Sequence, residues 1–159
     1  MLDLMTMNSI LRLARNDDIS VLEELIPLSV RSLQAPFYTP AQMEGALEPV
    51  FGVDRQLIND GTYFIAEQNG HVVGCGGWSK RKSLVGGAQG RAEADALLDP
   101  QHDSARVRAF FVHPAYARRG IGRMILEACE TAVVHAQFQT VELVATLAGE
   151  PLYRCFAYT

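Results

Sequence analysis

The sequence predicts a mixed α/β fold, in which a central, mostly antiparallel sheet is flanked by helices. A hairpin signal at Asn69-Gly70 joins two strand-like runs, residues 62–67 and 72–78. Further along, an apolar strand at 107–112 leads into a glycine-containing turn. The apolar residues after that turn recur at helical spacing to about residue 136. Strands and one long amphipathic helix therefore alternate along the chain.

The N-terminal part predicts one strand and three helices. Residues 10–14 alternate as a half-buried strand does, and Asn16-Asp17-Asp18 then offers capping side chains for a helix over 18–33. A second helix is expected at Thr39-Pro40-Ala41-Gln42, where a capping residue precedes proline and a glutamine follows three residues later. A short helix over 54–59 should end at Gly61.

The remaining elements surround the long connection at 80–104, which is polar and reads as a functional or mobile loop. The strand at 107–112 should end before Pro114. A strand at 141–146 follows the long helix, and a last short helix opens at Gly149-Glu150-Pro151. Residues 1–8 are expected to be flexible.

Size and composition predict one globular domain spanning residues 1–159, since 48% of the residues are apolar. The net charge of −4 gives no general attraction to nucleic acid or anionic lipid. No apolar run approaches the roughly 20 residues that cross a bilayer, and the start lacks the features of a signal peptide, so a cytoplasmic location without membrane contact is expected. Three widely spaced cysteines argue for reduced thiols and against a disulfide framework or metal site.

The turn between the strand at 107–112 and the long helix is suited to a pyrophosphate. Unpaired N–H groups and the positive end of the helix dipole point at one spot. Gly120 and Gly122 would let phosphates approach the backbone, and Arg118, Arg119 and Arg123 add positive charge. Many helices begin with glycine after a turn, so the two glycines alone indicate at most a site for anionic phosphate.

The segment around this turn resembles the GNAT acetyltransferase family, whose motif is Gln/Arg-x-x-Gly-x-Gly/Ala at the start of a long helix. Residues 117–122 match both glycines but carry Ala117 at the first position. Residues 152–158 resemble the family's Tyr-x-x-x-Gly-Phe/Tyr signature, with Ala157 replacing glycine. The resemblance covers nearly the whole chain. It implies the GNAT fold, acetyl-CoA as cosubstrate, no metal, and acetyl transfer to an amine.

The resemblance also implies roles for individual residues. The cofactor-binding set would be Phe111, Val112, His113, Arg118, Arg119, Gly120, Ile121, Gly122, Arg123 and Thr146. Tyr153 would be the catalytic acid, because a phenol with a pKa of about 10 is still protonated when a thiolate of pKa about 8.5 leaves. The alternative for Tyr153 is a core tyrosine packed under Phe156. A backbone N–H near Val112 would meet the oxyanion.

No general base can be named from the sequence. Glu67 and Glu142 lie in strands where structural roles are the better interpretation, and His113 is better explained as a turn residue. Nothing near Cys155 would activate it for a covalent acetyl-enzyme, so direct transfer in a ternary complex is expected.

The acceptor amine is expected between residues 35–39 and the 80–104 connection. Phe37, Tyr38 and Trp78 could supply aromatic walls, although Trp78 is equally well explained as core. Family members continue into a C-terminal hairpin that this sequence lacks, so either the chain is truncated or a second copy covers the edge of the strand at 141–146. A homodimer, or otherwise a damaged acceptor site, is therefore expected.

Two other functions compete with the enzyme. A non-catalytic module that binds acetyl-CoA as a sensor would need the two glycines and not Tyr153. A nucleotide-phosphate-binding domain of another α/β class is less favoured, because the segment lacks the Lys-Ser/Thr of a P-loop and the third glycine of a dinucleotide fingerprint.

Overall fold

The computed structural model describes residues 8–47, 50–83 and 96–159. Residues 1–7 of the expected flexible start, and the middle of the 80–104 connection, lie outside these ranges. The strands are β1 (Ile10–Leu13), β2 (Tyr63–Gln68), β3 (His71–Ser79), β4 (Ala105–Val112) and β5 (Val141–Glu142). The helices are α1 (Ile19–Leu33), α2 (Pro40–Leu47), α3 (Arg55–Asp60), α4 (Ile121–His135) and α5 (Glu150–Cys155), with 3-10 turns η2 (Asn16–Asp18) and η3 (Pro114–Tyr116).

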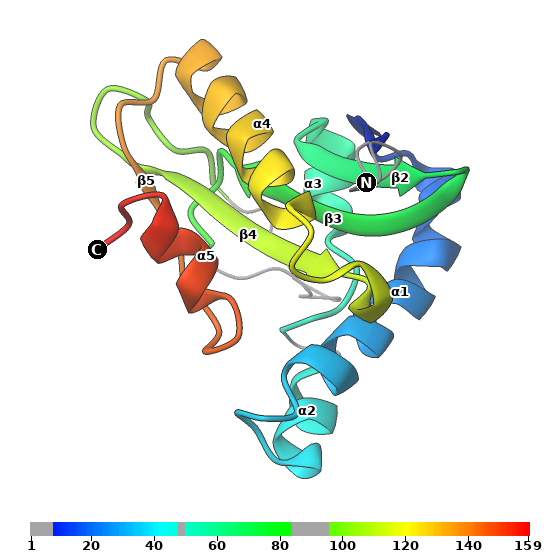
Figure 1. Cartoon of the computed structure of the whole chain (residues 1–159). Helices are drawn as coiled ribbons and strands as arrows, with labels where there is room; N and C mark the ends of the chain where they lie inside the picture. The colour runs from blue at the N-terminus through cyan, green and yellow to red at the C-terminus, as the bar shows by residue number, and fades with distance from the viewer. Residues whose placement is uncertain (1–7, 48–49, 84–95) are drawn as a thin grey trace, which may run out of the picture.

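The strands form one open sheet in the order β1-β2-β3-β4-β5 (Figure 1). Neighbouring strands are antiparallel except β4 and β5, which are parallel and are connected through α4. The predicted mixed, mostly antiparallel sheet is confirmed.

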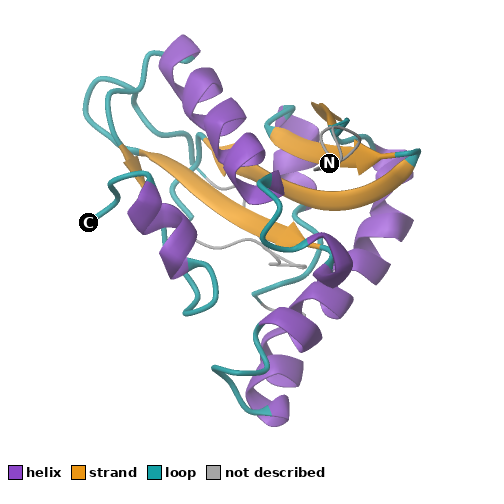
Figure 2. Ribbon diagram, in the orientation of Figure 1, coloured by secondary structure: helices purple, strands orange, loops and turns teal. Residues whose placement is uncertain are grey.

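Helices cover both faces of this sheet. Figure 2 shows α4 crossing the near face while α3 lies behind the strands. One buried cluster, here the α4 face, joins the sheet to α4 and α5 and includes Trp78, Ile125 and Tyr153. The other, here the α1 face, joins the sheet to α1, α2 and α3 and includes Leu22 and Tyr63.

Short-range sequence signals fix several turns. The capping box of α2 is formed in both directions: the Gln42 amide donates to Thr39 Oγ1 (3.1 Å) and the Thr39 amide donates to Gln42 Oε1 (2.8 Å). Gly61 ends α3 with a φ of 70°. Asn69 and Gly70 join β2 to β3 with φ values of 51° and 78°, as a tight hairpin requires.

Two predicted elements are shorter than expected. The strand predicted over 141–146 pairs with β4 only at Val141 and Glu142. Beyond Glu142 the chain leaves the sheet, because the carbonyl of Thr146 accepts the amides of Gly149 and Glu150 in the turn that starts α5. The first helix begins at Ile19 and not at Asp18, whose carboxylate accepts from the Arg15 amide and pairs with Arg12.

A β-bulge interrupts β4. Gly77 pairs with Arg108 and Cys75 with Phe111, so Ala109 and Phe110 together oppose Gly76. Ala109 has a φ of 63°, which side-chain-bearing residues seldom adopt. The extra residue reverses which side chains face which side of the sheet beyond this point.

Candidate functional site

The connection from β4 to α4 forms an exposed, positively charged turn, here called the cradle (residues 118–123). Arg118 and Gly120 have φ values of 62° and 87°, and Gly120 is the N-cap of α4. The first amides of α4 have no carbonyl one turn earlier in the helix, so they point outward with the positive end of the dipole. This arrangement suits an anionic phosphate group.

The cradle arginines are available to a ligand. Arg118, Arg119 and Arg123 are exposed, and none forms an ion pair with another residue in the described ranges. Arg119 lies over the ring of Tyr116 at 5.8 Å, and Arg123 over the ring of Phe156 at 5.3 Å. These contacts hold the guanidinium groups near the cradle without neutralising their charge.

Glycine is favoured at the two glycine positions of the cradle for different structural reasons. Gly120 has open space around the position of a Cβ, and its positive φ is what favours glycine. A Cβ on Gly122 would lie 3.0 Å from Leu152 Cδ2, so this glycine allows α5 to pack closely on α4.

The ladder between β4 and β5 ends before the bulge. Their ladder consists of Ala105 with Val141 and Arg106 with Glu142. The His113 amide donates to the Val73 carbonyl of β3 (2.8 Å), so the alternation of an antiparallel ladder turns the Val112 amide away from β3. Among the described residues, no strand pairs with that side of Val112. Its amide therefore points out from the unpaired edge of β4 beyond the end of β5, and the space beside this edge is here called the gap.

The main-chain groups of the three predicted cofactor-binding residues at the end of β4 differ in direction. Of Phe111, Val112 and His113, only Val112 directs its amide to the gap, because the His113 amide is already bonded to β3. The side chain of His113 acts within the turn, as expected: its Nδ1 accepts the Ala115 amide at 3.1 Å. Phe111 points its ring to the α1 face and contacts Phe51.

Tyr153 lies on α5, next to the gap. Its ring packs edge-on against Phe110 of β4 and against Tyr158, with centroids 6.0 and 5.9 Å apart. The residue is 8% exposed, and burial, followed by nearby Cys129, raises the pKa of its phenol. Among the described residues the Tyr153 hydroxyl has no hydrogen-bond partner. The phenol is therefore held protonated and is available as a donor.

Thr146 and its neighbours connect α5 to the other end of the molecule. Thr146 Oγ1 accepts the Gly149 amide (3.2 Å), so its side chain is occupied in the turn before α5. The adjacent Leu147 amide donates to the Tyr38 hydroxyl (3.1 Å), which comes from the corner between α1 and α2. Tyr38 thus links the expected acceptor side to the segment that carries Tyr153.

The expected aromatic walls differ in their surroundings. Phe37 is 48% exposed, and Tyr38 is half-buried. Trp78 is buried in the α4 face against Phe138, with centroids 6.0 Å apart, so it belongs to the core and does not line an acceptor site. Only the ends of the 80–104 connection fall within the described residues.

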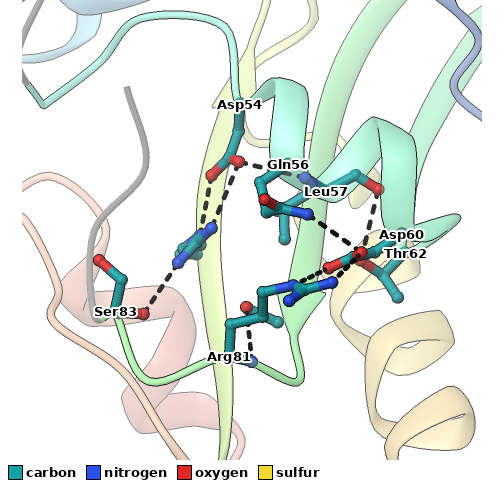
Figure 3. Close-up of polar contacts among 9 residues, drawn as sticks. Asp54, Gln56, Leu57, Asp60, Thr62, Arg81 and Ser83 are labelled. Carbon is teal, nitrogen blue, oxygen red and sulfur yellow. Dashed lines mark hydrogen bonds and ion pairs between the residues drawn. The ribbon is translucent and has the colours of Figure 1, made fainter. Parts of the chain in front are cut away.

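The sequence analysis missed a buried polar network on the α1 face. Arg108 Nε and Nη2 donate to the two carboxylate oxygens of Asp54 (2.8 and 3.3 Å), and Nη1 donates to the Ser83 carbonyl (2.8 Å). Nearby, Arg81 forms a two-pronged pair with Asp60, as Figure 3 shows. The available signal was an arginine inside the apolar run 107–112, since a buried guanidinium needs a carboxylate.

No described carboxylate stands out as a general base. Glu67 pairs with Arg12 and Glu142 pairs with Arg106, in line with the structural roles expected for both. Cys75 and Cys129 are buried and Cys155 is exposed, and all three are free thiols. In the described ranges, no three His, Cys, Asp or Glu side chains gather as a metal site would require. No helix there is long and apolar enough to span a membrane.

Comparison with known sequences identifies the family of this arrangement. The sequence model of the acetyltransferase (GNAT) family matches residues 28–158, which include the cradle, the gap and Tyr153. No curated protein matches the chain in sequence.

Solved structures with the same fold are distant in sequence. The PaiA N-acetyltransferase of Thermoplasma acidophilum, solved with coenzyme A, is 14% identical over 95% of this chain and 88% of its own, with a TM-score of 0.69. A GNAT acetyltransferase of Brucella melitensis, solved with acetyl-CoA, is 18% identical over 96% and 83%, with a TM-score of 0.61. A Pyrococcus horikoshii protein assigned as an acetyltransferase is 19% identical with a TM-score of 0.64, and the whole of this chain covers 46% of its length.

Proposed function

Since the chain belongs to the acetyltransferase (GNAT) family, we propose that it transfers the acetyl group of acetyl-CoA to a primary amine. The observation that carries this proposal is the alignment of three features along the α4 side of the sheet. The cradle offers amides and arginines, the Val112 amide faces the gap, and the unpaired phenol of Tyr153 lies beside that gap. In acetyl-CoA a pyrophosphate is joined through the pantetheine arm to a thioester, so the cradle would take the pyrophosphate while Val112 and Tyr153 meet the carbonyl and the sulfur of the thioester.

Acetyl-CoA would lie with its pyrophosphate in the cradle. The amides of Ile121, Gly122 and Arg123 and the side chains of Arg118 and Arg119 would bind the phosphate oxygens. The pantetheine arm would enter the gap at Val112. Thr146 would contribute to the site indirectly. Its hydroxyl accepts the Gly149 amide and so stabilises the turn that leads into α5.

The proposed reaction is a direct attack within a ternary complex. The neutral amine nitrogen forms a bond to the thioester carbon, the Val112 amide stabilises the oxyanion, and the carbon–sulfur bond breaks when the intermediate collapses. Tyr153 donates its proton to the sulfur, giving the free thiol of CoA. The proton lost by the amine returns to the Tyr153 oxygen through water, so the products are the amide and CoA-SH.

Replacement of Tyr153 tests this mechanism against the sensor alternative. Tyr153→Phe keeps the ring contacts with Phe110 and Tyr158 and removes only the donor. We expect thiol release in an amine screen to fall by about 100-fold, with acetyl-CoA affinity unchanged. Equal thiol release by the wild type and the variant would contradict the assigned role, and a wild type that binds acetyl-CoA but acetylates no amine would favour the sensor.

A thermal-shift comparison separates acetyl-CoA from other nucleotides. We expect the unfolding midpoint to rise with acetyl-CoA and CoA and to be unaffected by NAD at the same concentration. Stabilisation by ATP or NAD but not by acetyl-CoA would overturn the family-based proposal and favour the nucleotide-binding alternative.

We make three further proposals, which concern the extent of the domain, its location and its oligomeric state. We propose a single domain over residues 1–159, and a cytoplasmic location consistent with the three free thiols. We also propose a homodimer, supported by β5 as an unpaired edge of the described sheet and by the exposed Val144 and Leu147 beside it. A monomeric mass by light scattering at assay concentration would exclude the dimer.

A further inference from the structure

The bulge at Ala109 is a strained part of a strand that is otherwise regular. Alanine at a φ of 63° is less stable than glycine would be, so neighbouring groups must hold this conformation. The residues that contact the bulge from the α1 face identify these groups.

Tyr63 of β2 forms the first of these contacts. Its side chain is 1% exposed, and its hydroxyl donates to the Ala109 carbonyl at 3.0 Å and lies 3.2 Å from Cys75 Sγ. Burial and the neighbouring Cys75 raise the pKa of this phenol, so it remains a donor. A buried carbonyl without a partner would be costly, and here a single hydroxyl satisfies the carbonyl of the strained residue.

The second contact is the buried ion pair between Arg108 and Asp54. The two side chains are 4% and 3% exposed. Asp54 is itself fixed as the N-cap of α3, where Oδ1 accepts the Leu57 amide at 3.2 Å, as drawn in Figure 3. Arg108, directly before Ala109, is therefore paired with the N-cap residue of α3. The carbonyl of Ala109 itself is hydrogen-bonded to Tyr63 of β2.

The bulge sets the geometry on the opposite face. Because it adds one residue, Phe110 turns to the α4 face, where its ring contacts Tyr153. Gly76 lies opposite Phe110 on β3. A Cβ on Gly76 would be 2.6 Å from the Phe110 ring, so the ring packs directly on the backbone of Gly76. The same shift places the Val112 amide in the gap.

We propose that Tyr63, Arg108 and Asp54 form a bulge clamp, a set of positioning residues that holds Phe110, Tyr153 and the Val112 amide in register for acetyl transfer. The inference rests on the proposed function. The clamp acts from the side of the sheet opposite to acetyl-CoA, without touching either substrate. Its loss should therefore slow the reaction much more than it weakens acetyl-CoA binding.

Tyr63→Phe tests the clamp because it removes one hydroxyl and keeps the ring. We expect kcat to fall about tenfold, with the acetyl-CoA dissociation constant within about twofold of the wild type, since small misplacements of reacting groups reduce rates more than binding. Thr62→Val is the matched control: it removes a neighbouring buried hydroxyl, which donates to the Leu57 carbonyl and does not contact the bulge. If both variants reduce kcat equally, the effect is general destabilisation and the proposal is wrong.

A rescue variant adds a readout that a merely structural role would not change. Glycine adopts a positive φ without strain, so Ala109→Gly in the Tyr63→Phe background should restore at least half of the lost kcat. A double variant no faster than Tyr63→Phe would contradict the assignment of the hydroxyl to the bulge.

Hydrogen exchange separates failure of the clamp from failure of the proposed function. The His113 amide donates to Val73 just beyond the bulge, and Tyr63→Phe should accelerate its exchange while Thr62→Val leaves it unchanged. This measurement requires no substrate. If the wild type acetylates no amine, the proposed function fails, but hydrogen exchange still tests the clamp. Unchanged exchange of the His113 amide in Tyr63→Phe would overturn the clamp.

Discussion

The polar groups on the two faces of the sheet differ in whether they have bonding partners within the protein. Three groups on the side of α4 lack partners among the described residues. The cradle arginines form no ion pair there, and the Val112 amide faces no strand. The Tyr153 hydroxyl has no hydrogen-bond partner in the same ranges. On the α1 face, the buried groups Arg108, Asp54 and Tyr63 bond to one another or to the backbone. The polar groups of one face are therefore available to the proposed ligand, whereas those of the other face are bonded within the protein.

This difference explains why one strand can serve both faces. β4 carries Phe110 and Val112 toward the proposed site and Arg108 and Phe111 toward the supporting core. The bulge at Ala109 is where the alternation changes, so contacts on the supporting face determine the geometry on the other. Breaking the buried ion pair on the α1 face should mainly lower stability, whereas substitutions in the cradle should mainly weaken the binding of acetyl-CoA.

The largest effect on stability is expected from Asp54→Asn. The substitution leaves Arg108 buried without a countercharge, and breaking a buried pair in this way costs about 3–5 kcal/mol. Urea unfolding measures the loss. The control is Glu44→Gln, which breaks the exposed pair with Arg31 and should leave the midpoint unchanged. Equal effects of the two variants would remove the distinction between the buried and the exposed pair.

A smaller effect on stability, combined with weaker ligand binding, is expected from Gly120→Ala. An alanine at a φ of 87° costs about 1–2 kcal/mol, and relaxing that strain would turn the first amides of α4 away from the phosphates. Calorimetric titration with CoA should show weaker binding. Gly45→Ala is the matched control, because Gly45 lies inside α2 with open space around it and the change should stabilise the helix. Unchanged CoA affinity in Gly120→Ala would argue against the cradle.

The smallest effect is expected from Asp60→Asn, and it is complete at neutral pH and shrinks on the acid side. The hydrogen bonds from Arg81 lower the pKa of Asp60 below its ordinary value of 3.8. A lowered folded-state pKa contributes stability that is complete above the unfolded value and is lost as the pH falls through the folded value. Asp60→Asn should therefore show a smaller loss of stability between neutral pH and pH 3 than the wild type, as circular dichroism would show. An Asp60→Asn curve that followed the wild-type curve would exclude this contribution.

Features determined by neighbouring residues could be predicted from the sequence. The capping box of Thr39 and Gln42, the hairpin at Asn69-Gly70 and the end of α3 at Gly61 each depend on bonds or dihedral angles within four residues. The cradle was predicted for the same reason, since a strand, a glycine turn and a helix follow each other directly.

Features determined by distant residues could not be predicted in the same way. Nothing near Ala109 indicates a bulge, because the groups that hold it come from Asp54 and Tyr63 on other elements. The early end of β5 depends on the turn at Thr146, although the apolar pattern continues past Glu142. Trp78 could be wall or core by composition, and only its contact with Phe138 distinguishes the two.

The short parallel ladder between β4 and β5 has a consequence for the order of folding. Two residue pairs must close a loop that contains all of α4, so the entropic cost of forming them is large compared with the free energy that so short a ladder contributes. We expect the hairpin of β2 and β3 to form early and the docking of residues 141–159 to come last. Pulse-labelling hydrogen exchange during refolding would show late protection of α5, and simultaneous protection of α5 and β3 would contradict this order. The gap in which we propose that the thioester binds would then be the last part of the protein to form.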